Sequence, residues 1–291
     1  MSFAPESASR PHQASLRWQS QAVLLALVPL TAVWVTLEAG QLWYTHSPAL
    51  WIGAAICLLL AALVFSTRAA TPGAALTGAV FTGALWLQTP GLHTALWPLL
   101  ALLVLTFSAT RFGRRRKESL GTAEARRGRT ASQVAANLGV AALAGIPLSA
   151  AHVFTPVAFG GRAAMAAMVA AVAEATADTV SSELGQVLGG VPRMITSLRR
   201  VAAGTDGAIS LAGTLAGAMG AALVVLVAKR ALPLLSWRDA EIALAAGIVG
   251  TLVDSLLGAG PERRGWLNND AVNALSTLAA ALLAVWAVEW V

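Results

Sequence analysis

Long runs of apolar residues, separated by short polar links, occupy nearly the whole chain. A helix that crosses a membrane needs about 20 mostly apolar residues, and the lengths of these runs fit that requirement. They predict an all-α fold, a polytopic membrane helix bundle with about nine transmembrane helices. The predicted helices cover roughly residues 20–38, 47–66, 71–88, 91–110, 131–150, 161–182, 207–228, 238–258 and 271–290.

The basic residues predict how this bundle is oriented. With nine helices and a cytoplasmic N-terminus, 16 of the 20 Lys and Arg residues fall on the cytoplasmic side, as the positive-inside rule requires. The cell (inner) membrane is the expected location. The predicted organisation is a cytoplasmic tail (1–19), N-terminal transmembrane helices (20–110), a basic cytoplasmic loop (111–130) and a C-terminal transmembrane catalytic core (131–291).

Composition excludes several other classes of protein. The chain is 57% hydrophobic and only 12% charged, which is typical of an integral membrane protein. Its single cysteine, Cys57, cannot form an intrachain disulfide, and its four scattered histidines do not suggest a metal site. The net charge of +6 lies in short loops without a nucleic-acid-binding module, so no nucleic-acid partner is expected. The basic residues either orient the helices and contact membrane lipids, or hold phosphate groups.

Carboxylates inside a predicted membrane helix are the first candidates for chemistry. Glu174, Asp178 and Ser182 share one helical stripe, and Glu183 lies beside it near the cytoplasmic end. Charged residues within a membrane are costly and usually face a polar cavity. Oxygen ligands of this type suit Mg²⁺, particularly where a phosphate supplies the remaining oxygens. A proton or ion relay would use the same residue types.

The basic loop and the helix that follows it form a second polar cluster. Arg129, Gln133 and Asn137 recur at four-residue spacing and so share a helix face, with Lys117 earlier in the loop. The N-terminus of that helix favours an anion. These residues are candidates for binding phosphate, and hydrogen bonding between helices is the alternative role for Gln133 and Asn137.

A third cluster lies in the loop of residues 192–217, which combines arginines with a glycine-containing turn before a helix. Glycines permit close backbone approach, and a helix N-terminus suits a phosphate, although the loop is not a Walker A sequence. The candidate phosphate-binding residues here are Arg199, Gly204, Thr205, Asp206, Gly207 and Ser210.

The fourth cluster links the last two predicted helices. Asp254 lies about one turn from the cytoplasmic end of its helix, where helix capping does not explain it. Asn269, Asp270 and Asn273 begin the next helix, and an Asn or Asp there could simply cap it. All four clusters fall on the cytoplasmic side of the predicted topology, which indicates one site for a cytosolic phosphorylated molecule.

Four ordered motifs together resemble the DUF92 family of integral membrane proteins. They are GRTASQVAANLGVAAL, AEATADTVSSELG, PRMITSL followed by VAAGTDGAISLAG, and GTLVDSLLGA followed by NNDAVNALST. The resemblance covers roughly residues 60–290, and the family includes a plant kinase that acts on phytyl phosphate. It implies a kinase that converts a prenyl monophosphate to the diphosphate with CTP or another nucleoside triphosphate. The chain departs from the family pattern at Ala202 or Ala203 and at Ala208, where small residues replace a Pro and a Gly.

These observations lead to one mechanistic hypothesis. Asp178, with Glu174, Glu183 or Asp254, is expected to hold Mg²⁺ against the phosphates of the nucleotide, with metal ligands among Asp178, Glu183 and Asp254. The basic residues and the glycine loop would contact phosphate oxygens, and the prenyl tail would lie among small residues or in lipid. A transporter of a lipid phosphate or small anion, and a lipid-binding scaffold, are the alternatives. A homo-oligomer is compatible with the sequence.

Overall fold

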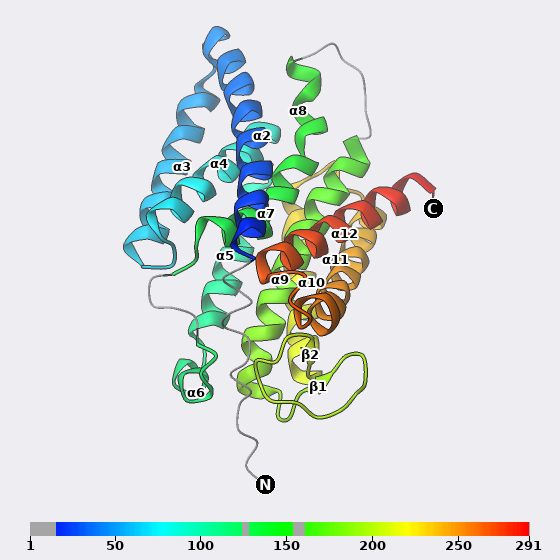
Figure 1. Ribbon diagram of the computed structural model, residues 1–291. Helices are drawn as coiled ribbons and strands as arrows, with labels where there is room; N and C mark the ends of the chain where they lie inside the picture. The colour runs from blue at the N-terminus through cyan, green and yellow to red at the C-terminus, as the bar shows by residue number, and fades with distance from the viewer. Residues whose placement is uncertain (1–15, 124–127, 154–160, 291) are drawn as a thin grey trace.

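The computed structural model describes residues 16–123, 128–153 and 161–290, so residues 1–15 of the predicted tail and 124–127 of the basic loop lie outside the described residues. The architecture is helical, with one short β-hairpin (Figure 1). The helices in chain order are α2 (Arg17–Tyr44), α3 (Pro48–Ser66), α4 (Pro72–Gln88), α5 (Leu96–Arg111), α6 (Arg114–Leu120), α7 (Ala131–Ala144), α8 (Ile146–Val153), α9 (Gly161–Leu188), α10 (Leu211–Ala231), α11 (Trp237–Leu257), the π-helical turn η1 (Gly258–Glu262) and α12 (Asn269–Trp290).

Helix α9 forms the centre of the bundle. Of its most apolar 18-residue window, 94% is buried, and it contacts α5, α7, α10, α11 and α12. Helices α9 and α10 approach closely because small residues lie on both sides of their contact. A Cβ atom on Gly213 would lie 2.6 Å from Ser181 O, and one on Gly217 would lie 2.6 Å from Ala177 O. Small residues at this spacing are typical of helices that pack tightly in membranes.

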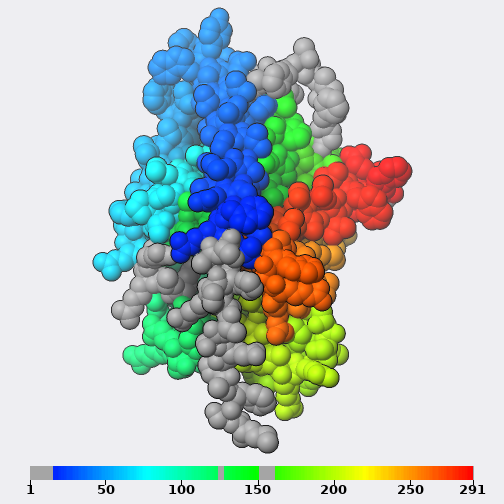
Figure 2. Space-filling model, viewed as in Figure 1, coloured from blue at the N-terminus to red at the C-terminus, as the bar shows by residue number. Residues whose placement is uncertain are grey.

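Helices α2 and α3 lie at the periphery and extend beyond the rest of the bundle at one end (Figures 1 and 2). Only 6% of the apolar window of α3 is buried, and large apolar side chains such as Leu58, Leu59 and Leu63 are exposed. An apolar surface this extensive would be costly in water, so these helices present it to lipid. The prediction of a polytopic helical membrane protein is confirmed.

The predicted number of spans requires correction. All nine predicted segments are helical, but among the described residues only six helices are long and apolar enough to cross a membrane, or seven if α5 and α6, bent by 60°, form one span. Helix α4 has 17 residues, most of them buried in protein, and α7 has 14 and is separated from α8 at Gly145. These helices gain stability from neighbouring helices, so they need not match the thickness of the bilayer.

A short hairpin replaces the predicted start of the helix at residue 207. Strand β1 (Arg193–Met194) pairs antiparallel with β2 (Ala208–Ile209), with Arg193 opposite Ile209, and α10 begins only at Leu211. The loop between the strands lies at the same end of the molecule as α6 (Figure 1). The predicted polar clusters therefore meet around a folded loop, not only along helix faces.

Candidate active site

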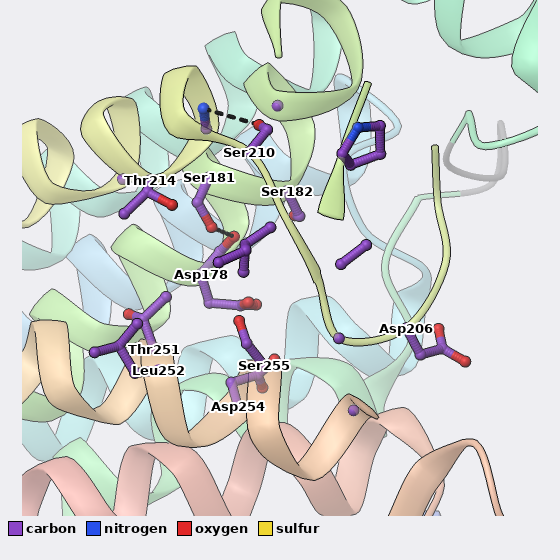
Figure 3. A pocket seen from close by; sticks show the side chains of 18 of the residues that line it. Asp178, Ser181, Ser182, Asp206, Ser210, Thr214, Thr251, Leu252, Asp254 and Ser255 are labelled. Carbon is purple, nitrogen blue, oxygen red and sulfur yellow. Dashed lines mark hydrogen bonds between the residues drawn. The ribbon is translucent and has the colours of Figure 1, made fainter. Parts of the chain in front are cut away.

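A cavity of about 320 Å³ lies where α9, α10, α11 and the hairpin loop converge. Figure 3 shows the side chains that reach it from these elements. The sequence predictions that the structure brings together in its lining are Asp178, Ser182, Gly204, Thr205, Asp206, Gly207, Ser210, Asp254 and Asn269.

Carboxylates from different elements face this cavity. Asp178 of α9 points toward α11, where Asp254 and Ser255 lie (Figure 3). The hydroxyl of Ser276 on α12 donates to Asp254 Oδ2 at 3.3 Å. Asp254 and Asp178 are close enough to repel each other, and Glu262 adds a further negative charge. A cation, hydrogen-bond donors or a shared proton can stabilise so many carboxylates in one place.

Glu174 lies one turn before Asp178 but does not line the cavity. Its side chain is 1% exposed, and its Oε1 atom has no hydrogen-bond partner. It packs against α11 at Gly250, where a Cβ atom would lie 2.7 Å from Glu174 Cγ. A buried carboxyl oxygen without a partner is costly, which is typical of a group retained for function.

The glycine loop meets η1 through backbone contacts. Gly207 has φ +73°, and a Cβ atom there would lie 2.3 Å from the backbone nitrogen of Ala259. Only glycine tolerates both the left-handed conformation and this proximity. The loop also carries Asp206, whose pKa is raised by burial and lowered in part by the nearby Arg263.

The N-terminus of α10 opens onto the same cavity. Ser210 caps the helix by accepting a hydrogen bond from Gly213 N at 3.1 Å, and Ser210, Gly213 and Thr214 all line the cavity. The first N–H groups of a helix have no intrahelical partners and carry a partial positive charge. The partial positive charge of this helix N-terminus favours an anion, and the carboxylates of the same cavity favour a cation.

Two predicted site residues are paired with each other outside the cavity lining. Lys117 Nζ forms an ion pair with Glu183 Oε2 at 2.5 Å and also donates to the backbone oxygens of Ala109 and Thr110. Lys117 is only 1% exposed, and neither residue lines the cavity. This pair joins α6 to the end of α9, a structural role that the sequence analysis did not assign to it.

Two residues of the second predicted cluster have different roles: Gln133 caps a helix, and Asn137 contacts Asn273 on another helix. Gln133 forms a capping box with Thr130 at the start of α7, with Thr130 N donating to Gln133 Oε1 at 2.8 Å. Asn137 donates to Gln133 O at 2.8 Å, and the amide of Asn273 lies 3.5 Å from Asn137 Oδ1. With its amide rotated, Asn273 donates to Asp254 Oδ2 at 3.3 Å. The amide nitrogen of Asn273 thus contacts Asn137 in one orientation and Asp254 in the other, so it meets only one of them at a time.

Arg129 reaches toward the carboxylates from the other side. Its Nη2 atom donates to Thr179 Oγ1 at 3.4 Å, and its charge attracts Asp178. Two further predicted residues lie outside the cavity lining: Arg199 is exposed on the hairpin loop, and Asp270 is nearly buried at the start of α12. Asn268, one residue earlier, provides the cap, because its Oδ1 accepts from Ala271 N at 2.9 Å.

Several residues of the lining were missed by sequence reasoning. Glu262 follows Pro261 and would be assigned to a solvated loop, but the π-helical turn continues α11 and turns this carboxylate into the cavity. Such turns are frequent at functional sites. Thr214, Thr251 and Gln186 also line the cavity, and no sequence motif sets them apart from other polar residues in helices.

The carboxylates of the cavity do not form a metal site made wholly of side chains, but they fit one that water and substrate phosphates complete. Within the ranges that the structure describes, no three His, Cys, Asp or Glu side chains form a complete metal-binding group. Mg²⁺ often takes only one or two carboxylates and obtains its other ligands from water and substrate phosphates. Asp178 and Asp254, which both line the cavity, match that partial set.

Comparison with known proteins shows the family. The chain matches the family described as integral membrane protein DUF92 over residues 55–281. It is 44% identical over 130 residues to an uncharacterised membrane protein of Methanocaldococcus jannaschii, covering 44% of this chain and 52% of that protein. It is 33% identical over 189 residues to an uncharacterised membrane protein of Synechocystis, covering 64% of this chain and 71% of that protein. It is 30% identical over 193 residues to the chloroplastic protein VTE6 of Arabidopsis thaliana, covering 64% of this chain and 56% of VTE6. No solved structure matches.

Proposed function

Because this chain belongs to the DUF92 family of integral membrane proteins, we propose that it is a prenyl-monophosphate kinase that uses CTP or another nucleoside triphosphate. The observation that carries the proposal is the convergence of Asp178, Asp254 and the loop of residues 204–207 on one cavity. Carboxylates, a glycine loop and a helix N-terminus in one cavity are groups that phosphoryl-transfer sites use. The similarity to VTE6 is the further support.

The reaction needs positioning and charge neutralisation. An oxygen of the acceptor phosphate attacks the γ-phosphorus, the bond between that phosphorus and its bridging oxygen breaks, and the nucleoside diphosphate leaves with the electron pair. The acceptor is largely ionised at neutral pH, so no side chain has to remove a proton. Bound Mg²⁺ would neutralise charge on the nucleotide phosphates, and Asp178 and Asp254 are the residues that would hold it.

The remaining cavity groups bind and orient. Ser210 and Thr214 at the start of α10 and the glycines Gly204 and Gly207 line the space in which nucleotide phosphates would lie. Ser276 donates to Asp254 Oδ2 from the side of α12 at 3.3 Å. Arg129 stands next to Asp178 and supplies a positive charge where the acceptor phosphate would meet the nucleotide.

A transporter of a lipid phosphate or anion is the competing function. It requires a polar route to the opposite end of the bundle, but the half of α9 beyond the cavity is apolar and buried from Ala163 to Ala173. Proteoliposomes loaded with a prenyl phosphate should therefore show no protein-dependent flux. Flux without phosphoryl transfer would replace the kinase proposal with the transporter.

The direct test uses purified protein in detergent with [γ-³²P]CTP, Mg²⁺ and geranylgeranyl or phytyl monophosphate. We expect a labelled prenyl diphosphate, and the other nucleoside triphosphates define the preferred donor. Absence of a diphosphate with every nucleotide and every prenyl phosphate, in protein that is folded and monodisperse, would overturn the proposal.

Carboxylate variants test the assigned roles. Asp178→Asn and Asp254→Asn should each lower turnover by about 100-fold or more, equivalent to about 2.7 kcal/mol of transition-state stabilisation, because neutral amides hold the metal poorly. Glu241→Gln, at an exposed position of α11, makes the same charge change away from the cavity and should retain activity. Activity retained in both aspartate variants would contradict the metal assignment.

A further inference from the structure

A second cavity, of about 770 Å³, opens beside the candidate active site and has a different character. It is a groove between α3, α4, α5 and α7, and most of its lining is aliphatic, including Leu63, Leu99, Leu103 and Val134. Volumes in this range accommodate whole small ligands, and an apolar lining suits a hydrocarbon.

Small residues on one face of α4 create the space. Ala74, Ala75, Gly78, Ala79 and Thr82 all line the groove and recur at spacings of three and four residues. From the first to the last of these positions the helix rises about 12 Å. A Cβ atom on Gly78 would meet only Val134 Cγ1, at 4.0 Å, so a side chain added there would occupy open space in the groove.

One end of this apolar groove is basic. Four arginines line it there: Arg68, Arg111, Arg114 and Arg129. Arg111 donates to Thr67 O at 3.2 Å and stacks over Phe107, and Arg114 pairs with Glu118. An apolar groove that ends in several guanidinium groups is complementary to a molecule with a hydrocarbon tail and an anionic head.

Arg129 connects the groove to the carboxylate cavity. Its backbone pairs with the start of α4, since Arg129 N donates to Ala69 O at 2.9 Å and Thr71 N donates to Arg129 O at 3.0 Å. Its side chain lines the groove and also reaches Thr179 on α9, one residue after Asp178. A phosphate bound at Arg129 would therefore lie between the two cavities.

We propose that the groove between α3, α4, α5 and α7 binds the prenyl chain of the acceptor lipid, with its monophosphate held at Arg129. The assignment rests on the proposed kinase function for the identity of the lipid. The chain extends along α4, away from Arg129, and the phosphate faces Asp178. The two substrates thus enter from different sides: the nucleotide from the hairpin loop and the lipid from the groove.

Binding of the acceptor without nucleotide tests this assignment independently of catalysis. The probe is radiolabelled geranylgeranyl monophosphate, titrated against the full-length protein in nanodiscs. Gly78→Phe places a ring in the groove about 10 Å along α4 from Thr71, and Leu76→Phe is the control, since Leu76 is 70% exposed on the same helix and does not line the groove. We expect Gly78→Phe to weaken binding at least tenfold and Leu76→Phe to bind as the wild type does.

Chain length and head group make the test more specific. Because the ring obstructs only the part of the groove beyond it, Gly78→Phe should discriminate against the 20-carbon chain more strongly than against the 10-carbon geranyl monophosphate. Arg129→Gln should weaken binding of the monophosphate at least tenfold and leave that of the uncharged alcohol, geranylgeraniol, unchanged.

The outcomes separate this inference from the proposed function. Equal affinity of the wild type and Gly78→Phe for the probe would overturn the groove assignment even if the protein is a kinase, provided that the variant unfolds at the same temperature as the wild type. With the protein in detergent, displacement of the probe by phospholipid added at equal concentration would assign the groove to membrane lipid and also overturn the proposal. Conversely, chain-length-dependent binding without any diphosphate product would support the groove and refute the kinase.

Discussion

The charge of Lys117 is enclosed by oxygen atoms. Its ammonium group has three acceptors, two backbone oxygens and Glu183, and the side chain is 1% exposed, whereas Glu183 is 15% exposed. An ion pair this sheltered differs from the exposed pair of Arg114 and Glu118, in which solvent screens both partners. Lys117 is thus expected to act on stability through the end of α9, and on catalysis only indirectly.

Removing one member of this pair should destabilise the protein. In Lys117→Met the carboxylate of Glu183 loses its partner, which should lower the free energy of unfolding by about 3–5 kcal/mol. The double variant Lys117→Met, Glu183→Gln should recover part of that loss, because no unpaired charge remains. Chemical unfolding in detergent measures both changes, and Arg114→Met is the control, with an expected effect of about 0–1 kcal/mol. Equal effects in Lys117→Met and Arg114→Met would contradict the structural role.

At the scale of elements, the candidate site depends on how the loop between β1 and β2 packs against η1. This contact involves backbone on both sides: a Cβ atom on Gly207 would lie 2.3 Å from Ala259 N, and one on Gly258 would lie 2.8 Å from Gly207 N. The loop contributes Thr205 and Asp206 to the cavity lining, and η1 contributes Glu262. Separating the two elements would widen the cavity at the end next to the hairpin loop.

Alanine substitutions at two glycines with similar backbone angles can separate the effect of a lost packing contact from the effect of backbone strain. Gly207 and Gly190 have φ of +73° and +66°, so alanine at either position costs about 1 kcal/mol in backbone strain. Only at Gly207 does the added Cβ atom collide with another element; at Gly190 nothing lies within 4 Å. Gly207→Ala should raise the KM for the nucleotide at least tenfold, and Gly190→Ala should leave it unchanged. The same KM in both variants would show that the contact with η1 is unimportant for the site.

At the scale of the whole molecule, the polar loops and the apolar surface are separated. The hairpin loop and α6 lie at one end, and the α2–α3 connection lies at the other (Figure 1). Between them, exposed leucines on α2, α3, α10 and α12 cover the surface. Such an arrangement places the hairpin end on a single side of the membrane, and the distribution of Lys and Arg favours the cytosolic side.

Cysteine labelling tests that orientation. In a Cys57→Ser background, Ser197→Cys places a thiol on the exposed hairpin loop, and Thr45→Cys places one at the exposed α2–α3 connection. A membrane-impermeant maleimide should label Thr45→Cys in intact cells and Ser197→Cys only after permeabilisation. The reverse pattern would place the candidate site on the outer side, away from cytosolic nucleotides.

The positions of the helices and many of the cavity residues were predictable because their signals are local. Apolar runs predict membrane helices from nearby residues alone, and carboxylates at Asp178 and Asp254 are conspicuous within such runs. The nine-helix segmentation was therefore correct as a prediction of helices. As a count of spans it exceeds the six or seven helices that are long and apolar enough to cross a membrane among the described residues, because the partners that allow α4 and α7 to be short come from distant parts of the chain.

By itself, the sequence determined that the protein is a helical membrane bundle with polar residues gathered in a few segments, since hydropathy and charge act over one or two helical turns. Only the tertiary structure decided which of these residues meet. It paired Glu183 with Lys117, turned Glu262 inward, and placed Arg129 between a polar cavity and an apolar groove. These outcomes depend on packing between helices far apart in sequence, which short-range patterns do not encode.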